Sequence, residues 1–249
     1  MGPVKIFLVG VSIGVLGFVT SLSNSQASAF YIVDPETKSA TIISHIYIYG
    51  SEATPKIANE ISTEINTMWN AKRFTLFFQG GRYRVRFDVT TEFVSTQKAW
   101  DLFKKNLSPK FNFLRIEKPS PKAAIPNFML GGNIGILFVY DKNGFHTTAA
   151  HEYGHGLGLD HPPIWEKTWT ANVPSIMYAR GTIVASQFQY NPKAEPGRKG
   201  GTIDPIYRQV TYMDWAHLML ANFKVYHSLQ RNGKTLYYGN IGMVSQSFY

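Results

Sequence analysis

The sequence of 249 residues predicts an α+β fold, in which strands and helices form a layer ahead of residue 150 and mostly irregular chain follows it. Before residue 150, segments rich in β-branched and aromatic residues alternate with segments of helical periodicity. After residue 161, the chain becomes rich in Pro and Gly until one last helical segment. Hydrophobic residues make up 44% of the chain and charged residues 16%, so it can bury a core as one globular domain.

The first predicted elements are a strand, a helix and a second strand. Residues 41–49 (TIISHIYIY) are β-rich and predict a strand. In residues 55–70, apolar side chains recur every fourth position, which indicates one buried helical stripe. These side chains are Ile57, Ile61, Ile65 and Trp69. Residues 82–94 begin by alternating Arg with Tyr, Val and Phe, as in a strand with one wet face.

The elements that follow are shorter and are separated by turns. We expect a short helix over 96–107, strands over 111–116 and 134–140, and a turn at 141–144 (DKNG). The stretch 131–139 predicts either a strand at the rim of a cleft or an ordinary interior strand. A final helix is predicted over 211–229, with Thr211 as N-cap and Asp214 three residues later.

The N-terminal segment has the pattern of a secretory signal peptide. A short positive start is followed by a nearly all-apolar run over 6–19, and Ala27-Ser28-Ala29 has small residues at the spacing of a signal-peptidase site. We therefore predict a signal peptide over 1–29 and a mature chain from Phe30, secreted or periplasmic. The alternative is an uncleaved anchor, but the apolar run is shorter than the ~20 residues of a spanning helix, so no stable membrane insertion is expected after cleavage.

Charge and cysteine content restrict the chemistry. Lys and Arg outnumber Asp and Glu by 25 to 16. This positive charge favours binding to anionic substrates, cell envelopes or membranes. The alternative is a generally basic surface without a specific partner. The sequence has no dense block of Lys and Arg, so we do not expect nucleic-acid binding. We also expect the chain to be a monomer. The chain has no cysteine, which excludes disulfides and thiolate chemistry.

The segment 151–161 (HEYGHGLGLDH) predicts a metal site. His151 and His155 are four residues apart and therefore project from the same side of a helix. Glu152 lies about 100° round the axis, where it can reach a water beside the metal rather than the metal itself. An apolar back is expected on the other side of the helix, formed by Ala149, Ala150, Tyr153 and Leu157.

Three glycines interrupt this helix, although each costs about 1 kcal/mol relative to Ala in a helix interior. These are Gly154, Gly156 and Gly158. Gly158 can end the helix with a positive φ, so that His161 turns back as the third ligand. Three neutral imidazoles suit Zn²⁺ and leave a fourth position open, as in catalytic sites. The alternative is a surface helix with unrelated histidines.

The string resembles the metzincin pattern H-E-x-x-H-x-x-G-x-x-H, and AAHEYGHGLGLDH resembles the matrix-metalloproteinase-like (matrixin) members. Ser175-Ile176-Met177-Tyr178 is similar to that family's Met-turn, although a lone Met is often core filler. The resemblance covers residues 149–178. It departs from the family in a longer stretch between His161 and Met177 and in the lack of a cysteine switch.

The resemblance implies a metzincin (zincin-like) fold, a twisted mixed sheet with the active-site helix above a small irregular C-terminal subdomain that ends in a helix. The catalytic domain would span 30–249, with an upper subdomain over 30–158 and a lower one over 159–249. It further implies a secreted endopeptidase for protein or peptide substrates, with one catalytic Zn²⁺ and Glu152 as general base. Tyr178 and Arg180 would line the substrate pocket.

Two other classes of function stay open at this point. One is a non-catalytic binding or adhesion protein on the same scaffold, against which an intact Glu152 argues. The other is a metallohydrolase that acts on something other than protein. Calcium bound through scattered carbonyl oxygens also stays open, although no acidic loop with EF-hand spacing predicts it.

Overall fold

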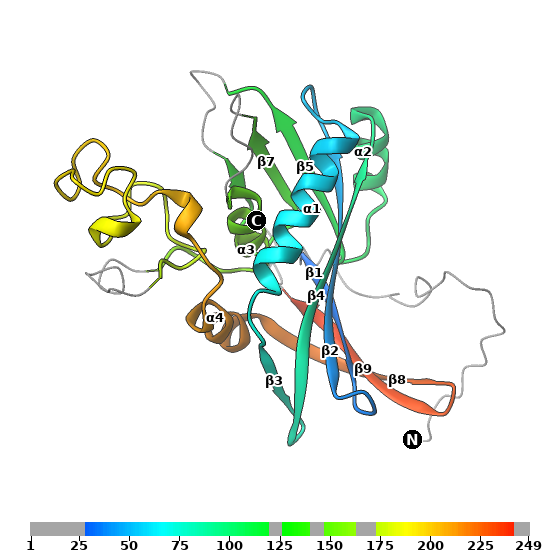
Figure 1. The fold of residues 1–249 in the computed structure, drawn as a ribbon. Helices are drawn as coiled ribbons and strands as arrows, with labels where there is room; N and C mark the ends of the chain where they lie inside the picture. Colours follow the sequence, from blue (N-terminus) through cyan, green and yellow to red (C-terminus); the bar gives the residue numbers. More distant parts are fainter. Residues whose placement is uncertain (1–27, 120–125, 140–146, 163–172, 242–249) are drawn as a thin grey trace, which may run out of the picture.

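The computed structural model describes residues 28–119, 126–139, 147–162 and 173–241. In these residues the chain forms a twisted mixed sheet flanked by helices (Figure 1). The strands are β1 (Ala29–Asp34), β2 (Ser39–Tyr49), β3 (Thr75–Phe78), β4 (Gly81–Phe93), β5 (Phe111–Glu117), β6 (Asn127–Phe128), β7 (Ile134–Phe138), β8 (Phe223–Arg231) and β9 (Lys234–Ile241). The helices are α1 (Pro55–Trp69), α2 (Thr96–Lys104), α3 (Thr148–Gly156) and α4 (Tyr212–Asn222), with 3₁₀ turns at Ser186–Phe188 and Pro205–Tyr207.

Strand β2 is the centre of the sheet. It runs parallel to β4 and β5 and antiparallel to β1. Strand β5 pairs in parallel with β7, and the short β6 pairs antiparallel with the outer side of β7. Helix α1 lies between β2 and β4 in the chain and α2 lies between β4 and β5, whereas β5 is followed by β6 and then β7.

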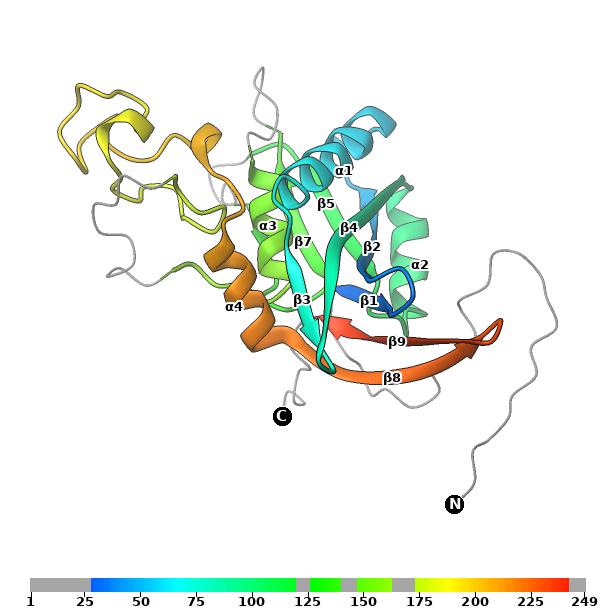
Figure 2. The ribbon, with the colours of Figure 1, turned by 60° about the horizontal axis from the view of Figure 1, so that its bottom comes forward.

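The two faces of the sheet carry two separate cores. Ile46 and Ile48 of β2 belong to the main core, which includes the buried stripe of α1. Tyr47 and Tyr49, their neighbours along the strand, pack instead in a smaller cluster with α2. Because successive strand residues point to opposite faces, α1 and α2 cover opposite faces of the sheet (Figure 2).

Helix α1 has the predicted buried stripe, and it also completes the edge of β4. The Asn66 amide accepts from Val89 N–H at 3.0 Å and donates to Val89 C=O at 2.7 Å. Asn70 makes the same pair of bonds with Phe87, both at 2.9 Å. Two amide side chains thereby take the place of a neighbouring strand.

The structure corrects the end of the chain. The predicted helix over 211–229 stops at Asn222, and residues 223–241 form the β8–β9 hairpin. Asn232 and Gly233 have φ values of 51° and 76° at its turn, the conformation that Asn-Gly adopts readily in two-residue hairpins. The expectation that the fold ends in a helix is therefore wrong for the described residues, because this hairpin signal outweighs the helical spacing before it.

The hairpin also joins the main sheet, since β9 pairs antiparallel with β1. One sheet thus contains strands from both sides of the predicted division at residue 158.

Elsewhere the predicted strands and helices are found with small shifts at their ends, such as α2, which stops at Lys104 rather than at residue 107. The predicted turn at 141–144 lies outside the described residues. No helix in the described part is long and apolar enough to cross a membrane.

Candidate metal centre

Helix α3 begins without a cap of its own. Thr147 at the N-cap position has φ of 68° and makes no side-chain capping bond. Glu64 of α1 fills this role, since its Oε1 accepts from Ala150 N–H at 3.0 Å and its carboxylate also accepts from the N–H groups of Ala149 and Thr147. A carboxylate at this end also opposes the positive end of the helix dipole. Burial raises the pKa of Glu64, while these three N–H bonds lower it.

The back of α3 is anchored in the main core. The four side chains predicted to form this apolar back are all buried. The Trp69 indole N–H donates to Ala150 C=O at 3.1 Å, and Tyr153 OH hydrogen-bonds Ser44 Oγ at 2.8 Å. The opposite side of the helix is left to present the histidines.

Close packing explains two of the three glycines, and a positive φ explains the third. A Cβ at Gly154 would overlap Met177 Sδ, and one at Gly156 would lie 2.8 Å from Ser28 Oγ. Gly158 has φ of 92°, Gly158 N–H donates to His155 C=O at 2.8 Å, and Leu159 N–H donates to Gly154 C=O at 3.0 Å. This pair of bonds is a Schellman motif, which ends the helix as the sequence predicts.

The three predicted ligands converge through one nitrogen each. His161 Nε2 lies 3.2 Å from His155 Nε2 and 3.3 Å from His151 Nε2, and ligand atoms of all three residues fall within 4.8 Å of one another. Nitrogens bound to one tetrahedral zinc at 2.0–2.1 Å are separated by about 3.3 Å. The group can therefore hold a metal ion.

Backbone carbonyls select the tautomers of two of these rings. His151 Nδ1 lies 2.6 Å from Ile176 C=O, and His155 Nδ1 lies 2.7 Å from Leu159 C=O. A carbonyl only accepts, so each Nδ1 carries the hydrogen and each neutral ring presents a lone pair at Nε2. A neutral His161 ring has a single N–H and can donate it to only one of these two lone pairs, whereas a metal ion between the rings can bind all three nitrogens. The donor set therefore fits a divalent metal, with the outer nitrogens held as in known zinc sites.

The environment keeps these imidazoles neutral. Burial is the main cause that lowers the pKa of His151 to about 2, and the Arg208 charge lowers it further. Burial also lowers the pKa of His155. Neutral rings are the form that binds metal.

Glu152 follows His151 in α3, and one of its carboxylate oxygens has no hydrogen-bond partner among the described residues. The side chain is 4% exposed, and it accepts a hydrogen bond from Phe128 N–H of β6. Its Oε2 is enclosed and has no partner among the described residues. Burial raises the pKa of Glu152 to about 7, although the Phe128 N–H and the charges of Arg208 and Arg180 oppose this rise.

The segment that carries Met177 passes beneath α3. Met177 is buried, and its N–H donates to Ser175 Oγ at 2.9 Å. Ser175 Oγ donates in turn to Asp214 Oδ1 at 2.5 Å. Asp214 also completes a capping box with Thr211 at the start of α4, as the sequence predicts. Helix α4 therefore holds this turn in place under the metal centre.

The two predicted pocket residues lie just after Met177. Tyr178 is half-buried, and its N–H donates to Ser175 C=O at 3.1 Å. Arg180 is exposed, and its Nη2 donates to Thr148 Oγ1 at 3.2 Å, at the first turn of α3. The structure therefore brings Arg180 to the same helix as the histidines.

Two features of the site escape the sequence prediction. Arg208 is 2% exposed, and its charge acts on His151, His155 and Glu152, yet no motif marks it. The strand over 131–139 is interior where it forms β7, because β5 and β6 pair with its two sides. The strand at the edge of the sheet beside α3 is instead β6. It has only two residues, which is too short to show an alternating pattern in the sequence.

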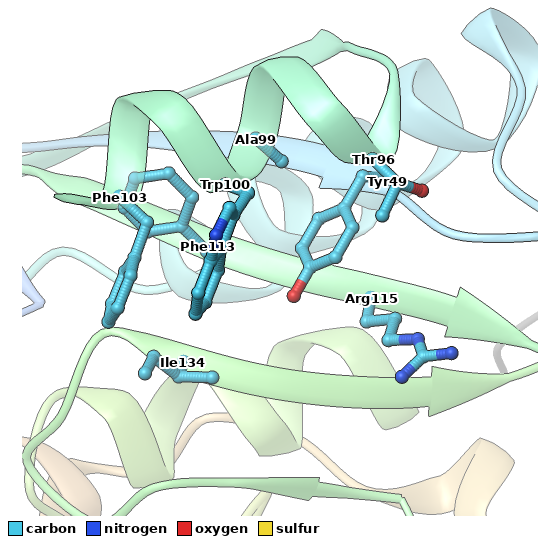
Figure 3. A pocket seen from close by; sticks show the side chains of 8 residues that line it. All are labelled: Tyr49, Thr96, Ala99, Trp100, Phe103, Phe113, Arg115 and Ile134. Carbon is cyan, nitrogen blue, oxygen red and sulfur yellow. The ribbon is translucent and has the colours of Figure 1, made fainter.

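A separate hollow lies on the opposite side of the sheet (Figure 3). Trp100 and Phe103 of α2 face Phe113 and Ile134 of the sheet, and Tyr49 and Arg115 close the rim. None of the metal-centre histidines lines it. It therefore belongs to the smaller core rather than to the metal centre.

Comparison with known proteins gives two distant similarities of fold. No protein-family model matches the chain, and no curated protein matches it. The structure of myroilysin is 12% identical over 73% of this chain and 94% of its own, with a TM-score of 0.35. A structure of a chaperone–substrate complex is 13% identical over 74% of this chain and 34% of its own, also with a TM-score of 0.35. The case for the metal centre therefore depends on the residues of this chain.

Proposed function

We propose that this chain is a secreted zinc-dependent endopeptidase of metzincin, matrixin-like type, with His151, His155 and His161 as zinc ligands and Glu152 as the general base. The observation that carries the proposal is that His161 Nε2 lies 3.2–3.3 Å from the Nε2 atoms of His155 and His151, while the same helix carries a buried carboxylate oxygen, Glu152 Oε2, without a partner among the described residues. Three ligands leave a coordination position open, as a catalytic centre requires.

The roles of the residues follow from their positions. Zinc, when bound, supplies a Lewis acid that acidifies water and polarises a carbonyl group. Glu152 Oε2 takes a proton from the attacking water and delivers it to the leaving nitrogen. The Phe128 N–H donates to the Glu152 carboxylate, and Oε2 has no hydrogen-bond partner among the described residues, so this oxygen can take the proton. A protein that only binds zinc would have no use for such a base.

The test is cleavage of casein and of a quenched peptide library by the purified chain, with zinc content measured on the same sample. We expect about one zinc per chain, cleavage that stops with a chelator, and recovery when zinc is restored. His155→Ala should lose both zinc and cleavage, whereas His45→Ala, on β2 away from the cluster, should keep both. Zinc binding without cleavage of any peptide would favour the binding-protein alternative, and chelator-resistant cleavage would contradict the proposal.

We also propose that the leader is removed ahead of Ser28 rather than ahead of Phe30. Ser28 and Ala29 are fully buried, and Ser28 C=O accepts from Ser44 Oγ at 2.8 Å and from Asn112 Nδ2 at 2.9 Å. Cleavage after Ala29 would remove one buried hydrogen bond from each of these two side chains, which would keep only Tyr153 OH and Lys110 C=O as partners, at a cost of roughly 0.5–1.5 kcal/mol for each lost bond. Ser25-Gln26-Ala27 offers the same small-x-small spacing two residues earlier.

N-terminal sequencing of the exported protein tests this prediction, and we expect the first residue to be Ser28. Deleting Ser28 and Ala29 from a chain that begins at Ser28 should lower its stability to denaturant. A mature protein that begins at Phe30 with unchanged stability would contradict the assignment.

A further inference from the structure

Arg208 is held firmly beside the metal centre by its neighbours in sequence. It follows the 3₁₀ turn Pro205–Tyr207, and Pro205 C=O accepts from Thr147 Oγ1 at 2.8 Å, at the start of α3. On its other side, Gln209 C=O accepts from Ile176 N–H at 2.6 Å. Arg208 is thus fixed between the helix that carries the ligands and the segment that carries Met177.

The guanidinium of Arg208 is buried, and no anion among the described residues forms an ion pair with it. The residue is 2% exposed, and its Nε is enclosed with no hydrogen-bond partner in the described part of the chain. None of the ion pairs found among the described residues includes it. A buried charge in this state costs several kcal/mol, so such groups are normally paired.

The Glu152 carboxylate does not pair with Arg208. Glu152 attracts Arg208 through space, but no hydrogen bond or ion pair joins them, and Glu152 Oε2 has no partner either. Arg180 adds a second positive charge, which repels Arg208. The place beside the catalytic carboxylate therefore has an excess of positive charge, with one cation buried and one exposed.

We propose that Arg208, with Arg180 at the rim, binds an acidic side chain of the substrate at a residue that adjoins the scissile bond. This inference rests on the proposed function. A carboxylate fits because the planar guanidinium can donate two parallel hydrogen bonds to it. A bound Asp or Glu side chain would also supply an anion that the described residues do not provide, so binding would compensate the buried positive charge of Arg208.

The test compares pairs of peptides that differ only in Glu against Gln, at each position on both sides of the cleaved bond. We expect kcat/KM to be about 10- to 100-fold higher for Glu at one adjoining position. In Arg208→Met this ratio should fall to near one, and in Arg208→Lys it should be intermediate. Arg198→Met removes an exposed charge elsewhere and should keep the preference of the unmodified protein.

A binding measurement separates this inference from the proposed function. Succinyl hydroxamate, which carries a metal-chelating group and a carboxylate, is compared with its primary amide by calorimetry on the zinc-loaded chain. We expect the carboxylate form to bind about 10-fold or more tightly, and the difference to vanish in Arg208→Met. Cleavage without an acidic preference, or equal affinity for the two hydroxamates, would overturn the inference and leave the peptidase proposal standing. If no peptide is cleaved but the difference in affinity is intact, the peptidase proposal is contradicted and carboxylate binding by Arg208 stands.

Discussion

Glu152→Gln is expected to lower kcat on peptide substrates by about 10²- to 10⁴-fold while zinc stays bound. Gln has the same shape and can keep the contact with Phe128 N–H, but it cannot take a proton from water. Because His151, His155 and His161 are unchanged, the metal content should stay near one per chain. Steady-state kinetics and metal analysis on the same sample measure the two effects separately.

Glu60→Gln is the matched control for this variant, since it makes the same chemical change on the exposed surface of α1. It should leave both kcat and zinc content as they are. Full activity in Glu152→Gln would refute the assignment of the base. Loss of zinc in that variant would instead show that Glu152 maintains the ligand geometry.

The largest expected effect on stability comes from Gly154→Val. Helix propensity alone would make this change mildly favourable, because Val is a better helix former than Gly. A side chain at this position, however, would overlap Met177 Sδ and press on Trp69 Cζ2, and both residues are buried. Overpacking of this kind costs about 1–3 kcal/mol, and we expect the upper end of this range for three added carbon atoms. Urea unfolding of the zinc-free protein measures it.

A double-mutant cycle identifies the cause of the loss. If Met177 is the obstacle, then Gly154→Val should cost far less when it is introduced into Met177→Ala. Additive effects of the two substitutions would show that Met177 does not restrict the helix. An unchanged free energy of unfolding in the single variant would show that α3 and Met177 are not in close contact.

Much of the fold could be predicted from local patterns. The four-residue spacing of Ile57, Ile61, Ile65 and Trp69 marks the buried stripe of α1, and the alternation of residues 82–94 marks β4. The C-terminal hairpin was missed, although Asn232-Gly233 is a strong signal of its own, because the apolar spacing before it also suits a helix.

The prediction of the metal centre was incomplete in a different way. The ligand spacing predicts which histidines meet, because the helix and its glycine end set their geometry locally. The groups that support them come from distant parts of the chain. Glu64, Asp214 and Arg208 act through tertiary contacts, and a lone Glu, Asp or Arg in a sequence gives no sign of them.

The pairing of β1 with β9 affects when the protein can finish folding. Ala29 lies opposite Ile241, so the two strands come from the beginning and the end of the described chain. Closing a loop of this size carries an entropic cost that must be met before the contacts form, and such long-range pairing slows folding. During synthesis from the N-terminus, β1 has no partner on this side until β9 has been made. The sheet is therefore completed only when β9 joins it, after all the residues of the metal centre have been made.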